Sequence, residues 1–308
     1  MQPSERQGPE LSDLIVDYDP QTLLRLPVRK QFVLDTLTKY GRRWPLRIAR
    51  SLPEDAGVLE PEAMDAILLR SHLELQRLHE EFDVGRTVLT LLGPLLDLAR
   101  RRTHERPLRI VDVGCGLGYI TRWLATVDKL GDDVELVGVD YNRALLGAAR
   151  SLAEAEQLDC RFIAANAFSL KEPAHLYMST GVVHHFRGDD LARFFAEHER
   201  AGAFGYLHVD IRPSLIAPLG SFVFHQARMR EPLARFDGYF SAVRAHHADT
   251  LLAAARDGLP DLACGMLDAR IGLAMLVRIF QAVVGARVTS SELASAYVPL
   301  GRRFEEPT

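Results

Sequence analysis

The strongest constraint on the fold is the stretch LRIVDVGCGLGYITRWLA, which runs from Leu108 to Ala125. An apolar, β-branched run ends in glycines at alternate positions, Gly114, Gly116 and Gly118, and a helical pattern follows at once. Such a turn lets a ligand touch the main chain, because no side chain stands in the way. It also leads into a helix N-terminus, where we expect unpaired N–H groups and a positive dipole end. The stretch therefore predicts a strand, a ligand-binding loop and a helix.

The same alternation of strand and helix continues along the chain. Further strands are expected at 134–140, 160–166, 174–180 and 204–212, and the last two within 262–280, where 269–278 is ambiguous between strand and helix. Amphipathic helices are expected at 142–158, opened by Asn142, at 189–201, opened by Asp189, and at 246–258. Apolar strands separated by such helices are typical of a parallel sheet covered on both faces. We therefore expect an α/β fold with a doubly wound, seven-stranded, mostly parallel sheet.

Other parts of the chain have a different pattern. Residues 1–10 are polar, carry two prolines and are expected to form a disordered tail. Helical signals dominate 11–104, with a kink or break at Gly93–Pro94, and predict an N-terminal helical cap that could also pair two subunits. The sheet occupies 105–308, apart from an insertion at about 213–245 that fits neither period.

Composition excludes several classes of function. Lysine and arginine number 37 against 41 acidic residues, and this net charge of −4 argues against a nucleic-acid partner. The three cysteines are scattered and form no Cys-x-x-Cys pair, so neither a disulfide framework nor a zinc site is expected. No other cluster has metal-ligand spacing, and capping of the following helix accounts for Asp189. Without a signal pattern or a membrane-spanning run, we expect a cytoplasmic protein with no membrane partner.

The glycine spacing discriminates between two kinds of ligand. Dinucleotide-binding loops use Gly-x-Gly-x-x-Gly, with the pyrophosphate at the helix N-terminus. Here Tyr119 occupies the position of the third dinucleotide glycine. This departure disfavours a nicotinamide cofactor, and an NAD(P)-dependent oxidoreductase is kept as an alternative.

At this point the chain resembles a known family. VDVGCGLGY resembles the first motif of class I S-adenosylmethionine-dependent methyltransferases, and LVGVDYN resembles the second, with its acidic residue at Asp140. FIAANAF and LYMSTGVVHHF match the third region and the fourth strand with its loop, and the resemblance covers roughly residues 108–280. The His-His-Phe ending is similar to that of small-molecule methyltransferases, including ubiquinone and menaquinone C-methyltransferase relatives. The resemblance implies S-adenosylmethionine as cofactor and S-adenosylhomocysteine as product.

The resemblance also implies a set of cofactor-binding residues. Asp140 would accept both ribose hydroxyls, and Asn166 stands where many members have an aspartate that accepts from the adenine amino group. Asp112 would approach the methionyl ammonium or order the glycine loop, and Tyr141 could stack beside the adenine. Cys115 is read as a small residue that fills a tight turn. The full set expected to bind cofactor is Asp112, Gly114, Cys115, Gly116, Gly118, Tyr119, Asp140, Tyr141, Asn166, Ala167, Phe168 and Thr180.

Methyl transfer is an in-line displacement, so positioning supplies much of the rate and a base is needed only when the acceptor loses a proton. His184 and His185 follow the fourth strand and are the candidate catalytic residues, although either could instead satisfy the loop backbone. Weaker candidates are His208, Asp210, His225, His246 and His247.

The expected function is methyl transfer to a small organic metabolite, in biosynthesis or secondary metabolism. The fourth-strand segment lacks the Asn/Asp-Pro-Pro-Tyr/Phe sequence of many enzymes that methylate bases and proteins, which favours a small acceptor. The sequence does not distinguish a carbon, oxygen or nitrogen acceptor. A further alternative is an inactive methyltransferase-like protein that serves as a binding partner.

Overall fold

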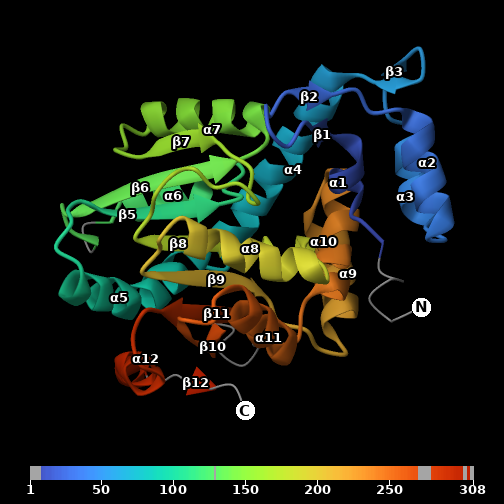
Figure 1. Cartoon of the computed structure of the whole chain (residues 1–308). Helices are drawn as coiled ribbons and strands as arrows, with labels where there is room; N and C mark the ends of the chain where they lie inside the picture. The colour runs from blue at the N-terminus through green and yellow to red at the C-terminus, as the bar shows by residue number, and fades with distance from the viewer. Residues whose placement is uncertain (1–7, 128–129, 270–278, 301–303, 306–308) are drawn as a thin grey trace. The chain divides into compact units, whose positions relative to one another are not determined.

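Figure 1 shows the computed structural model, which describes residues 8–127, 130–269, 279–300 and 304–305. The chain divides into two units, which we name by their main content. The helical unit comprises Met1–Leu78 and Pro213–Ala245, and the sheet unit comprises His79–Arg212 and His246–Thr308.

The sheet unit is built on one mixed sheet. Its strands are β5 (Leu108–Val113), β6 (Val134–Asp140), β7 (Arg161–Ala164), β8 (Leu176–Thr180), β9 (Gly205–Ile211), β10 (Ala263–Ala269), β11 (Phe280–Ala286) and the two-residue β12 (Phe304–Glu305). They lie in the order β12-β10-β11-β9-β8-β5-β6-β7. Strands β5 to β9 are parallel to one another, whereas β11 runs antiparallel to both β9 and β10. The expected number of seven strands is confirmed, and β12 extends the sheet beyond them. The position of the last strand was wrong, because β11 begins at Phe280, where the range expected for the last two strands, 262–280, ends. Of the ambiguous segment 269–278, residues 270–278 lie outside the described residues.

Helices connect these strands. They are α5 (Val84–Arg102), α6 (Tyr119–Ala125), α7 (Arg143–Ala155), α8 (Asp189–Arg200), α11 (Ala248–Gly258) and α12 (Ser290–Tyr297), with 3-10 turns η3 (Val183–His185) and η4 (Val298–Leu300). Asn142 caps α7 as predicted, because its side chain accepts from the N–H groups of Ala144 and Leu145. The prediction for Asp189 was wrong. The N-cap is Gly188 at φ 52°, and Asp189 begins the helix, where its charge still suits the dipole.

The break expected at Gly93–Pro94 is absent, since α5 runs through Pro94 as one described helix. Its buried face explains this, because ten of its residues are buried, several of them against the sheet. Tertiary packing of this kind outweighs the local cost of a proline. The helix also belongs to the sheet unit, whereas the sequence placed it with the N-terminal cap.

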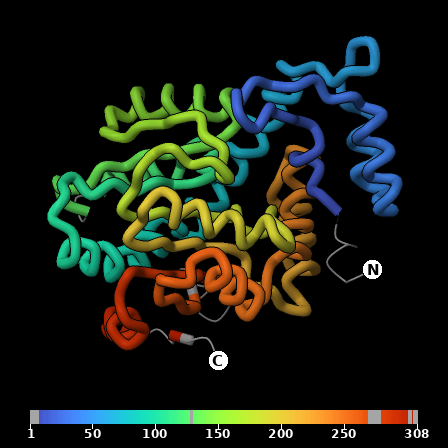
Figure 2. The backbone as a smooth tube through the Cα atoms, viewed as in Figure 1, coloured from blue at the N-terminus to red at the C-terminus, as the bar shows by residue number. Residues whose placement is uncertain are grey.

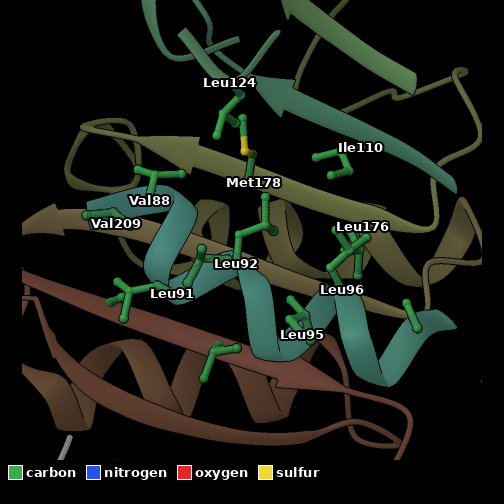
Figure 3. Close-up of a cluster of buried hydrophobic side chains, with 14 of the residues drawn as sticks. Val88, Leu91, Leu92, Leu95, Leu96, Ile110, Leu124, Leu176, Met178 and Val209 are labelled. Atoms are coloured by element: carbon green, nitrogen blue, oxygen red, sulfur yellow. The ribbon is translucent and has the colours of Figure 1, made fainter. Parts of the chain in front are cut away.

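Alternate residues of the strands supply two separate cores, one on each face of the sheet. Ile110 and Leu176 pack with α5 and α12, whereas their neighbours Val111 and Tyr177 pack with α8 and α11. Figure 3 shows the first of these clusters, in which the leucines of α5 lie against Ile110, Leu176 and Met178. Burial of both faces explains why the strands read as continuous apolar runs.

The helical unit contains α1 (Leu11–Ile15), α2 (Lys30–Lys39), α3 (Arg43–Arg50), most of α4 (Pro61–Glu81), α9 (Ala217–Arg228) and α10 (Pro232–Arg244). Two short hairpins, β1–β2 (Asp17–Tyr18, Arg25–Leu26) and β3–β4 (Glu54–Asp55, Val58–Leu59), interrupt the region expected to be helical throughout. The insertion at 213–245 is the helix pair α9–α10. Figure 2 shows this pair in orange, with α1 in blue beside it.

The expectation of a disordered tail at 1–10 was wrong for its last residues. Residues 1–7 lie outside the described residues, but Glu10 is buried. The carboxylate of Asp237 on α10 accepts from the N–H groups of Leu11 and Ser12, each at 3.0 Å, and so holds the start of α1. Within the described part of the chain, no helix has the length and apolarity to cross a membrane.

Candidate functional site

The glycine loop after β5 closes on itself. Gly114, Gly116 and Gly118 have φ values of 70°, 55° and 66°, in the left-handed region that favours glycine. The N–H groups of Gly114 and Cys115 donate to the carbonyl of Val139 at 2.8 and 3.0 Å, and that of Gly118 donates to Cys115 at 2.8 Å. The expectation of unpaired loop N–H groups was therefore wrong for these positions. The neighbouring strand supplies acceptors that the sequence pattern did not reveal.

Asp140 joins the loop to the next helix. It ends β6, and its Oδ2 accepts from the N–H of Gly116 at 2.9 Å while Oδ1 accepts from the N–H of Asn142 at 2.8 Å. The residue is only 8% exposed, so its carboxylate is held in one orientation at the carboxyl end of the strand. A carboxylate fixed in this way is suited to accept hydrogen bonds from a ligand's hydroxyl groups.

Asp112 lies one strand away and is tied to helix α6. Its Oδ2 accepts from the hydroxyl of Thr121 at 2.8 Å. Burial raises the pKa of Asp112 to about 7, and this exceeds the opposing effect of the Thr121 hydrogen bond. The contact agrees with the role of ordering the loop. Sequence reasoning missed Thr121, since a threonine on a helix gives no periodic signal of such a bond.

Phe162 fills the space beneath the loop. A Cβ atom on Gly118 would lie 2.2 Å from the Phe162 ring, and one on Gly138 would lie 2.9 Å from the Sγ of Cys115. Cys115 packs with the cluster around Phe162, and burial raises the pKa of its thiol well above the ordinary value. The thiol is thus a neutral packing group, as expected for a small residue in a tight turn.

The loops after β7 and β8 complete this edge of the sheet. The Oδ1 of Asn166 accepts from the N–H of Phe168 at 2.9 Å, and its carbonyl accepts from Ser169, so Asn166 shapes its own turn. The Phe168 ring lies under the guanidinium of Arg193 at 5.0 Å. The other expected positions are Ala167, which is half-buried, Thr180 at the end of β8, Tyr119 at the start of α6, and Tyr141, which is 44% exposed.

The two candidate catalytic histidines lie in η3 and differ in their surroundings. His184 is buried, and its ring Nδ1 and main-chain N–H both meet the carboxylate of Asp210 on β9. His185 is half-buried and its ring lies beside that of His184, with centroids 4.4 Å apart. The weaker candidate Asp210 is thus brought together with His184.

His246 holds the same turn from the other side. Its Nε2 lies 2.9 Å from the carbonyl of Phe186 and 3.2 Å from that of Val183, within hydrogen-bond distance of both. Burial lowers the pKa of His246 to about 4, so the ring is neutral. Its place on the chain suggested a group reaching in from the cap, whereas the structure places it as a support for η3 in the sheet unit.

The remaining histidines do not join the turn. His208 is fully buried between Ser179 and His198, at 2.9 Å from each, and burial lowers its pKa far below the ordinary value. His225 belongs to the helical unit, and His247 occupies the N-cap position of α11 without a side-chain capping bond.

Together the fold and the site define a doubly wound α/β domain whose ligand edge is formed by the loops after β5, β6, β7 and β8. Residues 110–203 match the family model described as a methyltransferase domain. This part of the chain is therefore similar to a methyltransferase domain, as its motifs predicted.

One curated relative and two solved structures illustrate the similarity. The chain is 31% identical over 98 residues to the demethylmenaquinone methyltransferase of Thermus thermophilus. The match covers 32% of this chain and 40% of the relative, so it spans less than half of that protein.

The solved structures share the fold. The plantazolicin methyltransferase BamL, in complex with a triazolic desmethylPZN analog and SAH, has a TM-score of 0.51 and 12% identity over 73% of this chain and 97% of its own. The plantazolicin methyltransferase BpumL, in complex with SAH, has a TM-score of 0.50 and 10% identity over 74% of this chain and 97% of its own.

Proposed function

We propose that the chain is an S-adenosylmethionine-dependent methyltransferase that acts on a small organic acceptor. The observation that carries this proposal is the position of Asp140, whose carboxylate is fixed by Gly116 and Asn142 at the end of β6. In this arrangement the acidic group is oriented toward the ribose hydroxyls of a nucleoside that lies against the glycine loop. S-adenosylmethionine would supply an electrophilic methyl group on its sulfonium.

The structure of the same glycine loop disfavours a dinucleotide cofactor. A pyrophosphate needs main-chain N–H donors at the helix N-terminus. Four N–H groups of the loop, those of Gly114, Cys115, Gly116 and Gly118, donate within the chain, which leaves fewer loop donors for a phosphate. In addition, Tyr119 occupies the position at which a dinucleotide-binding loop has its third glycine. Both observations favour a cofactor held through its ribose and its amino acid part over one held through a pyrophosphate.

The residues of this chain would contribute mainly positioning. The loop and Asp140 would fix the nucleoside, and Asp112 would keep helix α6 in register with β5 through Thr121. The η3 turn, held by Asp210 and His246, would present His184 and His185 beside the acceptor. An imidazole there can take a proton when the acceptor has one to lose.

A small acceptor agrees with the absence of the Asn/Asp-Pro-Pro-Tyr/Phe sequence and with the names of the relatives, a demethylmenaquinone and a plantazolicin methyltransferase. The three cysteines are free thiols, which suits the cytoplasm as the proposed location. Pairing of two chains through the N-terminal helices stays a prediction that sedimentation analysis tests.

Calorimetric titration with S-adenosylmethionine, S-adenosylhomocysteine and NADH tests the cofactor assignment. We expect micromolar binding of the first two by the wild type and loss of that binding in Asp140→Ala. Asp97→Ala is the matched control, because it removes the same charge from an exposed position on α5. Binding of NADH alone, or equal cofactor affinity in both variants, would overturn the proposal. Cofactor binding without release of S-adenosylhomocysteine across a panel of phenols, amines and carbon acids would favour the inactive alternative.

A further inference from the structure

An unusual concentration of exposed apolar side chains lies at the start of α9. Of the eleven large apolar residues that are exposed in the described part of the chain, five fall between 215 and 223. We call these the apolar face: Leu215, Ile216, Leu219, Phe222 and Val223. Leu215 is fully exposed and Ile216 is 75% exposed. Single exposed apolar residues are common, but a contiguous group of this kind marks an interaction site.

The apolar face is one side of the helix. Three of its members, Leu219, Phe222 and Val223, lie within α9, and at about 100° per residue they fall within an arc of about 100°. Leu215 and Ile216 immediately precede the helix. The opposite side is occupied, because the hydroxyl of Ser221 donates to the carbonyl of Gly238 on α10 at 2.6 Å. The His225 ring also closes on Gly238, where a Cβ atom would lie 2.1 Å from Nε2. Packing within the helical unit therefore uses one side of α9 and leaves the apolar side outward.

A basic face lies on the neighbouring helix α3. Residues 25–50 contain eight basic side chains and one acidic, although the whole chain is acidic. Arg43, Arg47 and Arg50 follow one another at spacings of four and three, and all are exposed. The ion pairs found among the described residues include none of these arginines. We call the three the basic face.

The two faces adjoin each other within the helical unit. Trp44, the neighbour of Arg43 on α3, meets Phe222 of the apolar face edge to face, with ring centroids 5.8 Å apart. No acidic residue occurs from Ile211 to Arg230, and Arg228 and Arg230 follow the apolar face along the chain. We take the apolar face and the basic face together as one surface, joined by the Trp44–Phe222 contact.

We propose that this surface docks the protein onto an anionic lipid bilayer. Apolar side chains on a helix bury into the boundary between headgroups and acyl chains, and flanking arginines bind the anionic headgroups. A second copy of the chain is a poorer occupant, because a two-fold contact would bring the same arginines together. The proposal departs from the expectation of no membrane partner, which rested on the lack of a signal pattern and of a membrane-spanning run and not on peripheral surfaces. The inference is independent of the proposed activity.

Co-sedimentation of the full chain with lipid vesicles tests this inference. One vesicle preparation contains phosphatidylcholine alone, and the other contains phosphatidylcholine mixed with phosphatidylglycerol. We expect binding to the mixed vesicles only, and weaker binding as salt is raised. Each arginine near an anionic surface contributes about fivefold to partitioning, so the triple variant Arg43→Gln, Arg47→Gln, Arg50→Gln should bind about a hundredfold more weakly. Leu219→Ser with Val223→Ser should also abolish sedimentation.

Matched controls come from exposed residues elsewhere. Leu73→Ser changes an exposed leucine of α4 outside the apolar face. A second triple variant removes the same charge from the sheet unit, at Arg86, Arg101 and Arg161. Both controls should bind like the wild type, and circular dichroism shows whether every variant is folded. Equal binding to both vesicle types, no binding at low salt, or a dimer that the two serine substitutions dissociate would each overturn the proposal.

Discussion

Asp210 accepts two hydrogen bonds from one residue, His184. Its Oδ2 lies 3.0 Å from the main-chain nitrogen and its Oδ1 lies 2.8 Å from the ring Nδ1. Burial alone would raise the pKa of Asp210. The His184 ring and the N–H donors lower this pKa by more than burial raises it, so the net shift is downward. The carboxylate is thus ionised at neutral pH, so Nδ1 of His184 carries a proton and donates it to Oδ1. The pair fixes both the η3 turn and the tautomer of its ring.

Asp210→Asn should weaken this turn. The asparagine amide keeps one acceptor oxygen, but an NH₂ group replaces the other. At least one of the two His184 donors, the main-chain N–H or the ring N–H, therefore loses its partner. Loss of a hydrogen bond to a charged group costs about 1.5–3 kcal/mol, and we expect the free energy of unfolding to fall by that amount. Urea unfolding at pH 7 measures it, with Asp97→Asn as an exposed control. An unchanged midpoint would mean that the pair does not stabilise the fold.

His184→Asn separates a positioning role from that of a base. The amide nitrogen of asparagine can donate to Asp210 in place of Nδ1, while the lone pair on Nε2 is lost. If His184 is the base, kcat should fall by about 10²–10⁴-fold with the affinity for S-adenosylmethionine retained. If it only positions the turn, the variant should keep its turnover, whereas Asp210→Asn should lose it. The measurement is turnover of S-adenosylmethionine alongside calorimetry.

His185→Ala tests the more accessible ring. His185 is half-buried beside His184 and has the better access to an acceptor. A general base there should give a pH–rate profile with an ascending limb, and the alanine variant should lose that limb. Normal turnover by the variant would eliminate His185 as the base.

Gly118→Ala should damage the loop. Its φ of 66° disfavours a side chain, and the added Cβ would lie 2.2 Å from the Phe162 ring. The strain and the overpacking together should lower the free energy of unfolding by about 2–5 kcal/mol and weaken cofactor binding. Gly147→Ala is the contrasting control, since it lies within α7 with open space around it and should gain about 0.5–1 kcal/mol. Thermal unfolding compares the two, and equal shifts would refute the steric argument.

The sequence predicted those features that depend on local signals. Five parallel strands, the cap at Asn142 and the glycine turn follow from apolar runs, a capping residue and backbone conformations that only glycine adopts readily. The position of Asp140 at the end of β6 follows from the same pattern. These features need no knowledge of distant parts of the chain.

Features that depend on tertiary contacts were missed or misplaced. Pro94 signalled a break, but the sheet holds α5 together along its buried face. The pairing of Asp210 with His184 joins residues 26 apart in the chain, and the bonds from His246 to the carbonyls of η3 span about 60. The secondary structure of the insertion could not be predicted because α9 leaves its apolar side exposed. The sequence pattern of α9 therefore matches neither a buried strand nor an ordinary surface helix.

The buried carboxyl of Asp112 should make stability depend on pH. Its pKa is raised from the ordinary 3.8 to about 7, mainly by burial, so the folded chain holds a proton that the unfolded chain has released. Where the folded state binds more protons, stability falls as pH rises. Asp112 should therefore cost nothing below about pH 4, and its penalty should grow toward pH 7, to about 4 kcal/mol at most.

Asp112→Asn removes this titration, and its amide can still accept from Thr121. We expect the fall in the free energy of unfolding between pH 5 and pH 7.5 to be smaller in the variant than in the wild type. Urea unfolding at the two pH values gives the difference, in which other titrating groups such as Asp237 cancel because both proteins contain them. Thr121→Val is the companion variant. It removes the hydroxyl that lowers the pKa of Asp112, so it should steepen the dependence that Asp112→Asn flattens. Parallel pH profiles in all three proteins would show that Asp112 ionises without cost.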